Sequence, residues 1–91
     1  MIVWTRSAVN DLDALRTIAE LDPRSRGARR VIEAVSFLEM TAHLGRPGRV
    51  KGTRELVLVD VPYIVAYRVV AGTVEVLRVL HTARRWPRRL R

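Results

Sequence analysis

The sequence contains no cysteine, few aromatic residues, a single lysine and no long apolar run. Without cysteine the chain can form neither a disulfide bond nor a thiolate metal site. Its apolar runs are much shorter than the roughly 20 residues that a membrane-spanning helix needs. Met1 to Trp4 lead directly into a strand-like pattern instead of a signal peptide. These absences predict a cytoplasmic protein without a cofactor, a metal site or a membrane contact.

The residues that are abundant are apolar and basic. Apolar residues make up 48% of the 91-residue chain, which is enough for one small folded domain and too much for a disordered segment. The formal net charge is +8, and Lys51 is the one lysine among 17 lysine and arginine residues. Arginine binds carboxylates and phosphates through paired hydrogen bonds. We therefore expect an anionic partner, either a nucleic acid or an acidic protein, although a GC-rich genome also enriches arginine.

Two amphipathic helices are expected in the first half of the chain. The first begins after Ser7, a favourable N-cap residue, and ends at Asp22-Pro23, because proline cannot continue a helix. The second begins after Ser25 and carries apolar residues at helical spacing from residue 28 to residue 38. Cations that oppose the helix dipole crowd its start: Arg24, Arg26, Arg29 and Arg30. This cluster is either a solvated face or a docking patch for a partner.

The second half of the chain changes to a strand pattern. Residues 43–52 contain three glycines, one proline and three cations, and therefore predict a loop. Strands are expected at residues 2–5, 53–59, 62–70 and 73–80, with Ala71-Gly72 as a two-residue hairpin turn. The order β-α-α-β-β-β predicts an α+β fold, a mainly antiparallel sheet with two helices packed on one face. We assign residues 1–83 to this domain and residues 84–91 to a basic, irregular C-terminal tail.

The hairpin turn determines which side chains share a face of the sheet. If this turn forms, Arg68 lies opposite Glu75, and directly opposed residues point to the same side. With an even number of residues in the preceding loop, alternation collects charged groups on the side away from the helices: Glu55, Arg68, Glu75 and His81. Arg54 then falls on the helix side, where Arg78 interrupts an apolar row. Either Arg78 extends out of the core or the register slips by one residue, and the sequence leaves both open.

A histidine, an arginine and a glutamate on one sheet surface could cleave RNA. Cleavage needs a base for the 2′-hydroxyl proton, an acid for the leaving 5′-oxygen and cations for the developing phosphate charge. The candidate catalytic residues are Arg54, Glu55, Arg68 and His81. Alternatively, Arg68 and Glu75 form a cross-strand ion pair and His81 is structural. The sequence contains no convincing nucleophile triad, phosphate-binding glycine loop or metal-ligand cluster.

Several motifs along the chain resemble, in their order, one known family. A first strand with Trp4 precedes AVNDLDAL, LGRPGRVKGTREL leads into the sheet, and PYIVAYRV, VEVLRVLH and RRWP follow. Together they resemble the RelE/ParE superfamily of toxins from bacterial type II toxin–antitoxin modules, also labelled plasmid stabilisation proteins. The resemblance implies growth arrest and neutralisation by a cognate antitoxin. The antitoxin's acidic C-terminal segment would bind the toxin and its N-terminal part operator DNA, so that DNA is only an indirect partner.

The superfamily has two branches with different targets. RelE-like members cut messenger RNA on the ribosome without a metal ion, whereas ParE-like members poison DNA gyrase. RelE-like enzymes commonly carry an arginine where this chain has Ile64, and some carry a glutamate where it has Gly48. The resemblance is therefore closer to the ParE-like branch. A ribosome-dependent mRNA endoribonuclease is the alternative, and a non-toxic antitoxin-binding module is the second alternative.

The resemblance and the arginine-rich surface together suggest contact residues. The candidates for binding the target are Lys51, Arg54, Arg68, His81, Arg84, Arg85 and Trp86. Three of these residues also belong to the ribonuclease alternative. The candidates for binding the antitoxin are the arginines near the start of the second helix, Arg24, Arg26, Arg29 and Arg30.

Overall fold

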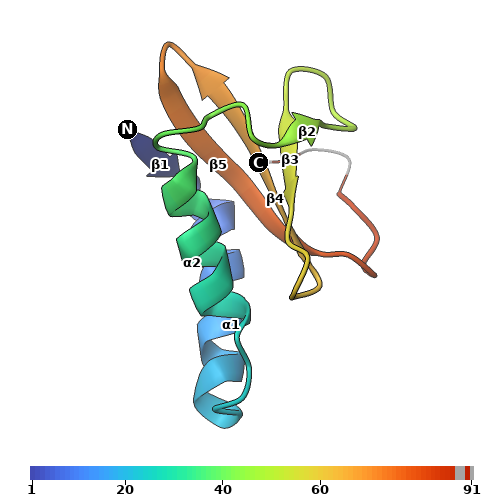
Figure 1. The fold of residues 1–91 in the computed structure, drawn as a ribbon. Coiled ribbons are helices and arrows are strands. Elements are labelled where there is room, and N and C mark those ends of the chain that lie inside the picture. The colour runs from blue at the N-terminus through green and yellow to red at the C-terminus, as the bar shows by residue number, and fades with distance from the viewer. Residues whose placement is uncertain (88–89, 91) are drawn as a thin grey trace.

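A computed structural model describes residues 1–87 and residue 90 of the chain (Figure 1). The elements in chain order are β1 (Ile2–Trp4), α1 (Arg6–Leu21), α2 (Gly27–Phe37), β2 (Arg46–Pro47), β3 (Arg54–Val57), β4 (Tyr63–Val70) and β5 (Thr73–His81). This arrangement confirms the predicted order β-α-α-β-β-β. The short strand β2 is an addition, because it lies within the segment that was expected to be a loop.

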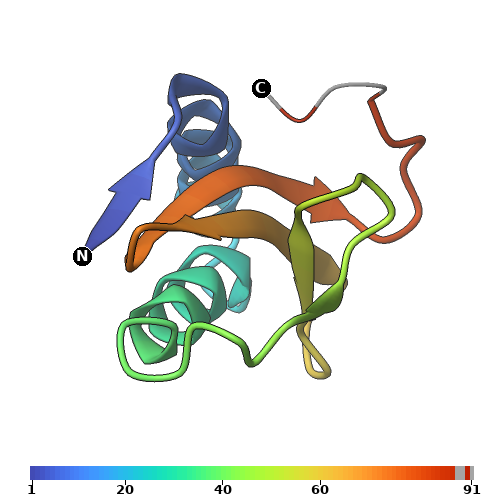
Figure 2. The same cartoon turned by 90° about the horizontal axis from the view of Figure 1, so that it is seen from above.

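The five strands form one sheet in the order β1-β5-β4-β3-β2. All neighbouring strands are antiparallel except β1 and β5, which run parallel with Ile2 opposite Val74. The two helices form an antiparallel pair that lies along β4 and β5 (Figures 1 and 2). The predicted α+β fold with a mainly antiparallel sheet is therefore confirmed. No helix in the described part of the chain is long and apolar enough to cross a membrane.

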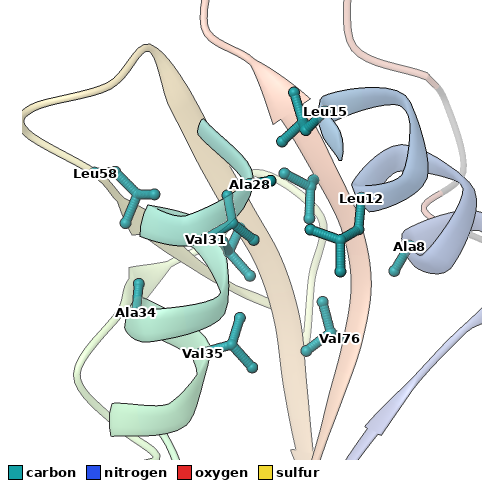
Figure 3. Close-up of a cluster of buried hydrophobic side chains, with 11 residues drawn as sticks. Ala8, Leu12, Leu15, Ala28, Val31, Ala34, Val35, Leu58 and Val76 are labelled. Carbon is teal, nitrogen blue, oxygen red and sulfur yellow. The ribbon is translucent and has the colours of Figure 1, made fainter. Parts of the chain in front are cut away.

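The main core lies between the helices and one face of the sheet. Figure 3 shows α1 and α2 side by side over the strands, with apolar side chains directed into the space that they share. Each helix contributes residues three or four positions apart, because that spacing gives a helix one apolar face. The buried members of this cluster are Ala8, Leu12, Leu15, Ala28, Val31, Ala34, Val35, Leu58, Val65, Val76 and Val79.

Both helices begin at a residue other than the expected serine. Thr5, not Ser7, caps α1, because its hydroxyl accepts a hydrogen bond from the Ala8 N–H (3.1 Å) and donates one to the Leu77 carbonyl (2.8 Å). The second of these bonds reaches across the fold to β5, so tertiary contact selects the cap. At α2 the capping position belongs to Arg26, one residue after Ser25, and no side chain caps the helix.

A β-bulge in β5 settles the question of the register around Arg78. Tyr67 lies opposite Val76, as the hairpin predicts, but Ala66 lies opposite Arg78, so the register slips by one residue at Leu77. Beyond the bulge, the side chains of β5 therefore point to the opposite faces from those that strict alternation predicts. Val79 packs into the helix-side core, and His81, opposite Tyr63, shares that side. The prediction that His81 lies on the face of Arg68 and Glu75 is wrong, because one extra residue reverses the end of the strand.

The opposite face of the sheet carries a smaller apolar cluster, formed by Ala66, Leu77, Leu80 and Leu90. Val50, from the segment between β2 and β3, and Trp86 pack against it. In Figures 1 and 2 residues 82–87 turn away from the end of β5 and run alongside the sheet. The tail thus contributes Trp86 and Leu90 to a surface that the helices leave uncovered.

Candidate functional site

Glu55 is the one buried polar or charged residue among those that the structure describes. It lies on β3 opposite Ala66, with 3% of its surface exposed. Its Oε1 accepts a hydrogen bond from Arg46 (3.2 Å), and its Oε2 accepts bonds from the backbone N–H (2.8 Å) and Nε (3.2 Å) of Arg49. Burial alone would raise the pKa of Glu55, but these hydrogen bonds outweigh it and hold the pKa below its usual value. Glu55 is therefore an ionised acceptor that holds the β2–β3 segment in place.

Arg49 connects this carboxylate to the tail. Its guanidinium lies 3.5 Å from the centre of the Trp86 ring, a cation–π contact, while its Nε binds Glu55. Trp86 in turn packs against the cluster that contains Leu90. The contacts from Glu55 through Arg49 to Trp86 hold Trp86 beside this face of the sheet.

The other candidate catalytic residues also have internal partners. Arg68 forms a hydrogen-bonded ion pair with Glu75 across β4 and β5, as the structural alternative predicts. Arg54 lies on the helix side opposite Tyr67 and donates a hydrogen bond to the Gly45 carbonyl (2.6 Å). The loop before β4 has the expected even count, since Glu55 shares the face of Ala66 and Arg68. The fold brings Glu55 and Arg68 to one face, but it separates His81 from both.

His81 lies at the end of β5 on the helix side. Its ring meets the Tyr63 ring edge-on, with centroids 5.4 Å apart. Its Nδ1 accepts a hydrogen bond from the Ala83 N–H (3.0 Å). His81 and Tyr63 line a pocket of about 370 Å³ between α1 and the end of β5, here called the α1–β5 pocket.

Arg78 and Asp11 form one wall of the α1–β5 pocket. Arg78 donates two hydrogen bonds to the Asp11 carboxylate, at 2.7 Å from Nε and 3.0 Å from the terminal nitrogen. The Val79 N–H donates a third at 2.9 Å. The bond to Asp11 raises the pKa of Arg78 above its ordinary value. Sequence reasoning missed Asp11, because it lies 67 positions before Arg78 and alternation within a strand does not identify a partner on a helix; an aspartate on the inner side of the first helix was the one available signal.

The arginines at the start of α2 are largely occupied. Asp60, in the loop between β3 and β4, accepts hydrogen bonds from Arg26 (3.1 Å) and Arg30 (2.6 Å). The bond from Arg30 lowers the pKa of Asp60 and raises that of Arg30. Arg24 lies 3.5 Å from Asp22, whereas Arg29 is exposed and makes no ion pair with a described residue. Asp60 thus relieves the clash between these cations and the helix dipole.

Three of the target-binding candidates have free charges. Lys51, Arg84 and Arg85 are exposed, and none of them makes an ion pair within the part of the chain that the structure describes. Lys51 follows Val50 in the β2–β3 segment, and Arg85 precedes Trp86 in the tail. Val50 and Trp86 pack against the same apolar cluster, which brings the two segments to one side of the molecule.

Comparison with known proteins identifies relatives of this chain in sequence. Residues 2–86 match the family described as the ParE toxin of type II toxin–antitoxin systems, parDE. The chain is 44% identical over 89 residues to the toxin homologue Y4kP of Sinorhizobium fredii, covering 94% of this chain and 92% of that protein. It is 37% identical over 86 residues to Toxin RelE2 of Caulobacter vibrioides, covering 91% and 96% of the two chains.

A solved structure has the same fold. It comes from the chromosomal ParDE toxin–antitoxin system of P. aeruginosa and superposes with a TM-score of 0.73 at 30% sequence identity. The match covers 88% of this chain and 92% of the other. Sequence family, relatives and fold agree with the resemblance seen in the motifs. The chain therefore belongs to the ParE toxin family of type II toxin–antitoxin systems, which implies that a cognate antitoxin is its partner.

Proposed function

We propose that this toxin arrests bacterial growth by binding and poisoning DNA gyrase, and that its antitoxin neutralises it by direct binding. The gyrase target is the one that the ParE-like branch implies, and the chain belongs to the ParE family. The observation that carries the proposal is that the four candidate catalytic residues do not share one face of the sheet: Glu55 and Arg68 lie on one side, and Arg54 and His81 lie on the other. A toxin that binds its target needs no such residues, whereas a ribonuclease does.

The candidate residues do not form an acid–base pair. Glu55 is held ionised beneath two guanidinium groups, so it has no proton to give at neutral pH. Arg68 is paired with Glu75, and His81 lies on the other side of the sheet. RNA cleavage would require the base and the cation to reach the same phosphate. This geometry supports action by binding over cleavage.

The proposed contact surface for gyrase consists of Lys51, Arg84 and Arg85, with Trp86 beside them. Their charges are exposed and unpaired within the described residues, unlike those of Arg54 and Arg68, which have internal acceptors. A cationic surface of this kind increases the rate of encounter with an acidic protein or a protein–DNA complex. We therefore narrow the target-binding set to these exposed residues.

A supercoiling assay tests the proposal directly. Relaxed plasmid, purified gyrase and ATP are mixed with increasing toxin, and we expect supercoiled product to be lost. Arg85→Ala should raise the toxin concentration that halves the supercoiled product by about fivefold, because one charged contact contributes about 1 kcal/mol to binding. Arg16→Ala, which removes an exposed arginine from α1, is the matched control and should leave that concentration unchanged.

Induced expression in a bacterial host separates the alternatives. DNA-damage induction together with loss of plasmid supercoiling supports gyrase as the target. Cut transcripts with normal supercoiling would overturn the proposal in favour of a RelE-like ribonuclease. Unchanged growth would instead leave a module that binds its antitoxin without toxicity.

A further inference from the structure

The α1–β5 pocket combines an apolar floor with a cationic rim. Leu15 of α1 and Val79 of β5 belong to the core beneath it, and Ile18 is 45% exposed on its α1 side. Arg78, His81 and Arg84 line the opposite side. An exposed isoleucine beside three basic residues is a surface on which a ligand with both apolar and anionic parts would be stabilised.

The positive charge of this pocket is not cancelled by its own acid. Asp11 is the one carboxylate among the described residues that line it, and its two oxygens already accept three hydrogen bonds from Arg78 and Val79. Asp11 and Arg78 therefore neutralise each other. Arg84 remains exposed and makes no ion pair with any described residue, so its guanidinium is available to a ligand.

His81 adds a second donor. Because its Nδ1 accepts the hydrogen bond from Ala83, the neutral ring carries its proton on Nε2. The contact with the Tyr63 ring holds the imidazole at this end of the strand. Without the bulge at Leu77, alternation would place His81 on the other face of the sheet. Bulges commonly redirect a side chain towards a functional site.

We propose that the α1–β5 pocket is the site where the antitoxin inserts an acidic side chain flanked by apolar residues. The carboxylate binds between Arg84 and His81, and the neighbouring apolar side chains pack on Leu15 and Ile18. The net charge of +8 favours an acidic partner over a second copy of this chain. The inference rests on the proposed function, because it names the place where neutralisation occurs. Since Arg84 is also a proposed gyrase contact, an antitoxin bound here would cover part of the gyrase-binding surface.

Amide NMR with a minimal probe tests the pocket without gyrase or growth. The probe is the blocked tetrapeptide acetyl-Leu-Glu-Leu-Ala-amide, and its control is the same peptide with glutamine in place of glutamate. We expect the glutamate peptide to cause saturable shifts at Val79, His81 and Ala83. The glutamine peptide should bind about tenfold more weakly, because a hydrogen bond to a charged group contributes roughly 1.5 kcal/mol.

Two variants complete the test. Arg84→Ala should weaken the binding of the glutamate peptide by about tenfold and leave the affinity for the glutamine peptide unchanged. Arg6→Ala removes another exposed arginine, which lies outside the pocket, and should have no effect. Equal binding of the two peptides, or equal effects of the two variants, would overturn the assignment. Because growth is not measured, these outcomes stand apart from the gyrase assay, which tests the proposed function by itself.

Discussion

The two faces of the sheet are held in different ways. On the helix side, a continuous apolar cluster runs from Ala8 of α1 to Val79 of β5. On the opposite side, the apolar cluster has four buried members and lies beside two ion-pair groups, one around Glu55 and one joining Arg68 to Glu75. Apolar burial is non-directional, whereas charged hydrogen bonds depend on geometry. The helix side therefore supplies most of the stability, and the opposite side sets the positions of the loop and the tail.

Truncating one leucine on each face gives the largest expected contrast. Leu38 is fully buried against the helix side, so Leu38→Ala should lower the free energy of unfolding by about 3 kcal/mol through lost burial and an unfilled cavity. Leu90 is also buried, but its cluster has four buried members, so fewer apolar contacts are lost. We expect Leu90→Ala to cost about 1 kcal/mol. Urea denaturation measures both, and equal losses would contradict the contrast between the faces.

Removing the charge of Glu55 tests how much the ion pairs stabilise the face opposite the helices. Glu55→Gln keeps the shape of the side chain but leaves Arg46 and Arg49 without a charged partner. The expected cost is about 2 kcal/mol at neutral pH, because the carboxylate is buried while the arginines are partly solvated. Fluorescence of Trp86 should report the displaced tail, since Arg49 stacks on its ring.

The contribution of Glu55 should also depend on pH in a defined direction. Its folded pKa is lowered from a usual value of 4.5, so the stabilisation is complete above that pH and is lost as the pH falls through the folded pKa. The difference in unfolding free energy between wild type and Glu55→Gln should therefore shrink between pH 7 and pH 3. A constant difference would mean that the charge of Glu55 does not stabilise the fold.

The smallest expected change in stability concerns the hairpin turn that joins β4 to β5, at the edge of both faces of the sheet. Ala71 has a φ of +50° and Gly72 one of +79°, so the turn holds an alanine in the left-handed region. Ala71→Asn should raise the free energy of unfolding by about 0.5–1 kcal/mol, because asparagine tolerates this conformation. Gly72→Ala should lower it. Thermal unfolding measures both, and a loss of stability in Ala71→Asn would contradict the assignment of strain to this position.

The local patterns were the predictable part of the molecule. The apolar spacing in both helices, the hairpin at Ala71-Gly72 and the pairing of Arg68 with Glu75 are local patterns, and the structure confirms each of them. The helix caps were predicted less well. Thr5 caps α1 in place of the predicted Ser7, because its hydroxyl also bonds to the carbonyl of Leu77, which lies 72 residues away in the sequence.

The candidate site was less predictable, because it depends on one irregularity and on distant charges. The sequence showed that Arg78 breaks an apolar row, but it could not choose between a snorkelling side chain and a shifted register. The β-bulge at Leu77 shows that the register shifts, and the folded structure also brings Arg78 to Asp11 on α1. In the same way, the alternation rule could not anticipate that Asp60 would bind Arg26 and Arg30 from a distant loop.

The parallel pairing of β1 with β5 has a consequence for the order in which this molecule assembles. During synthesis β1 emerges first, yet the strand beside it begins at Thr73. Until that strand appears, the β1 backbone lacks its neighbour and Thr5 lacks the Leu77 carbonyl to which it bonds. Contacts between such distant segments form slowly. The growing chain thus spends most of its synthesis as an incomplete sheet, with the backbone hydrogen-bonding groups of β1 still unpaired.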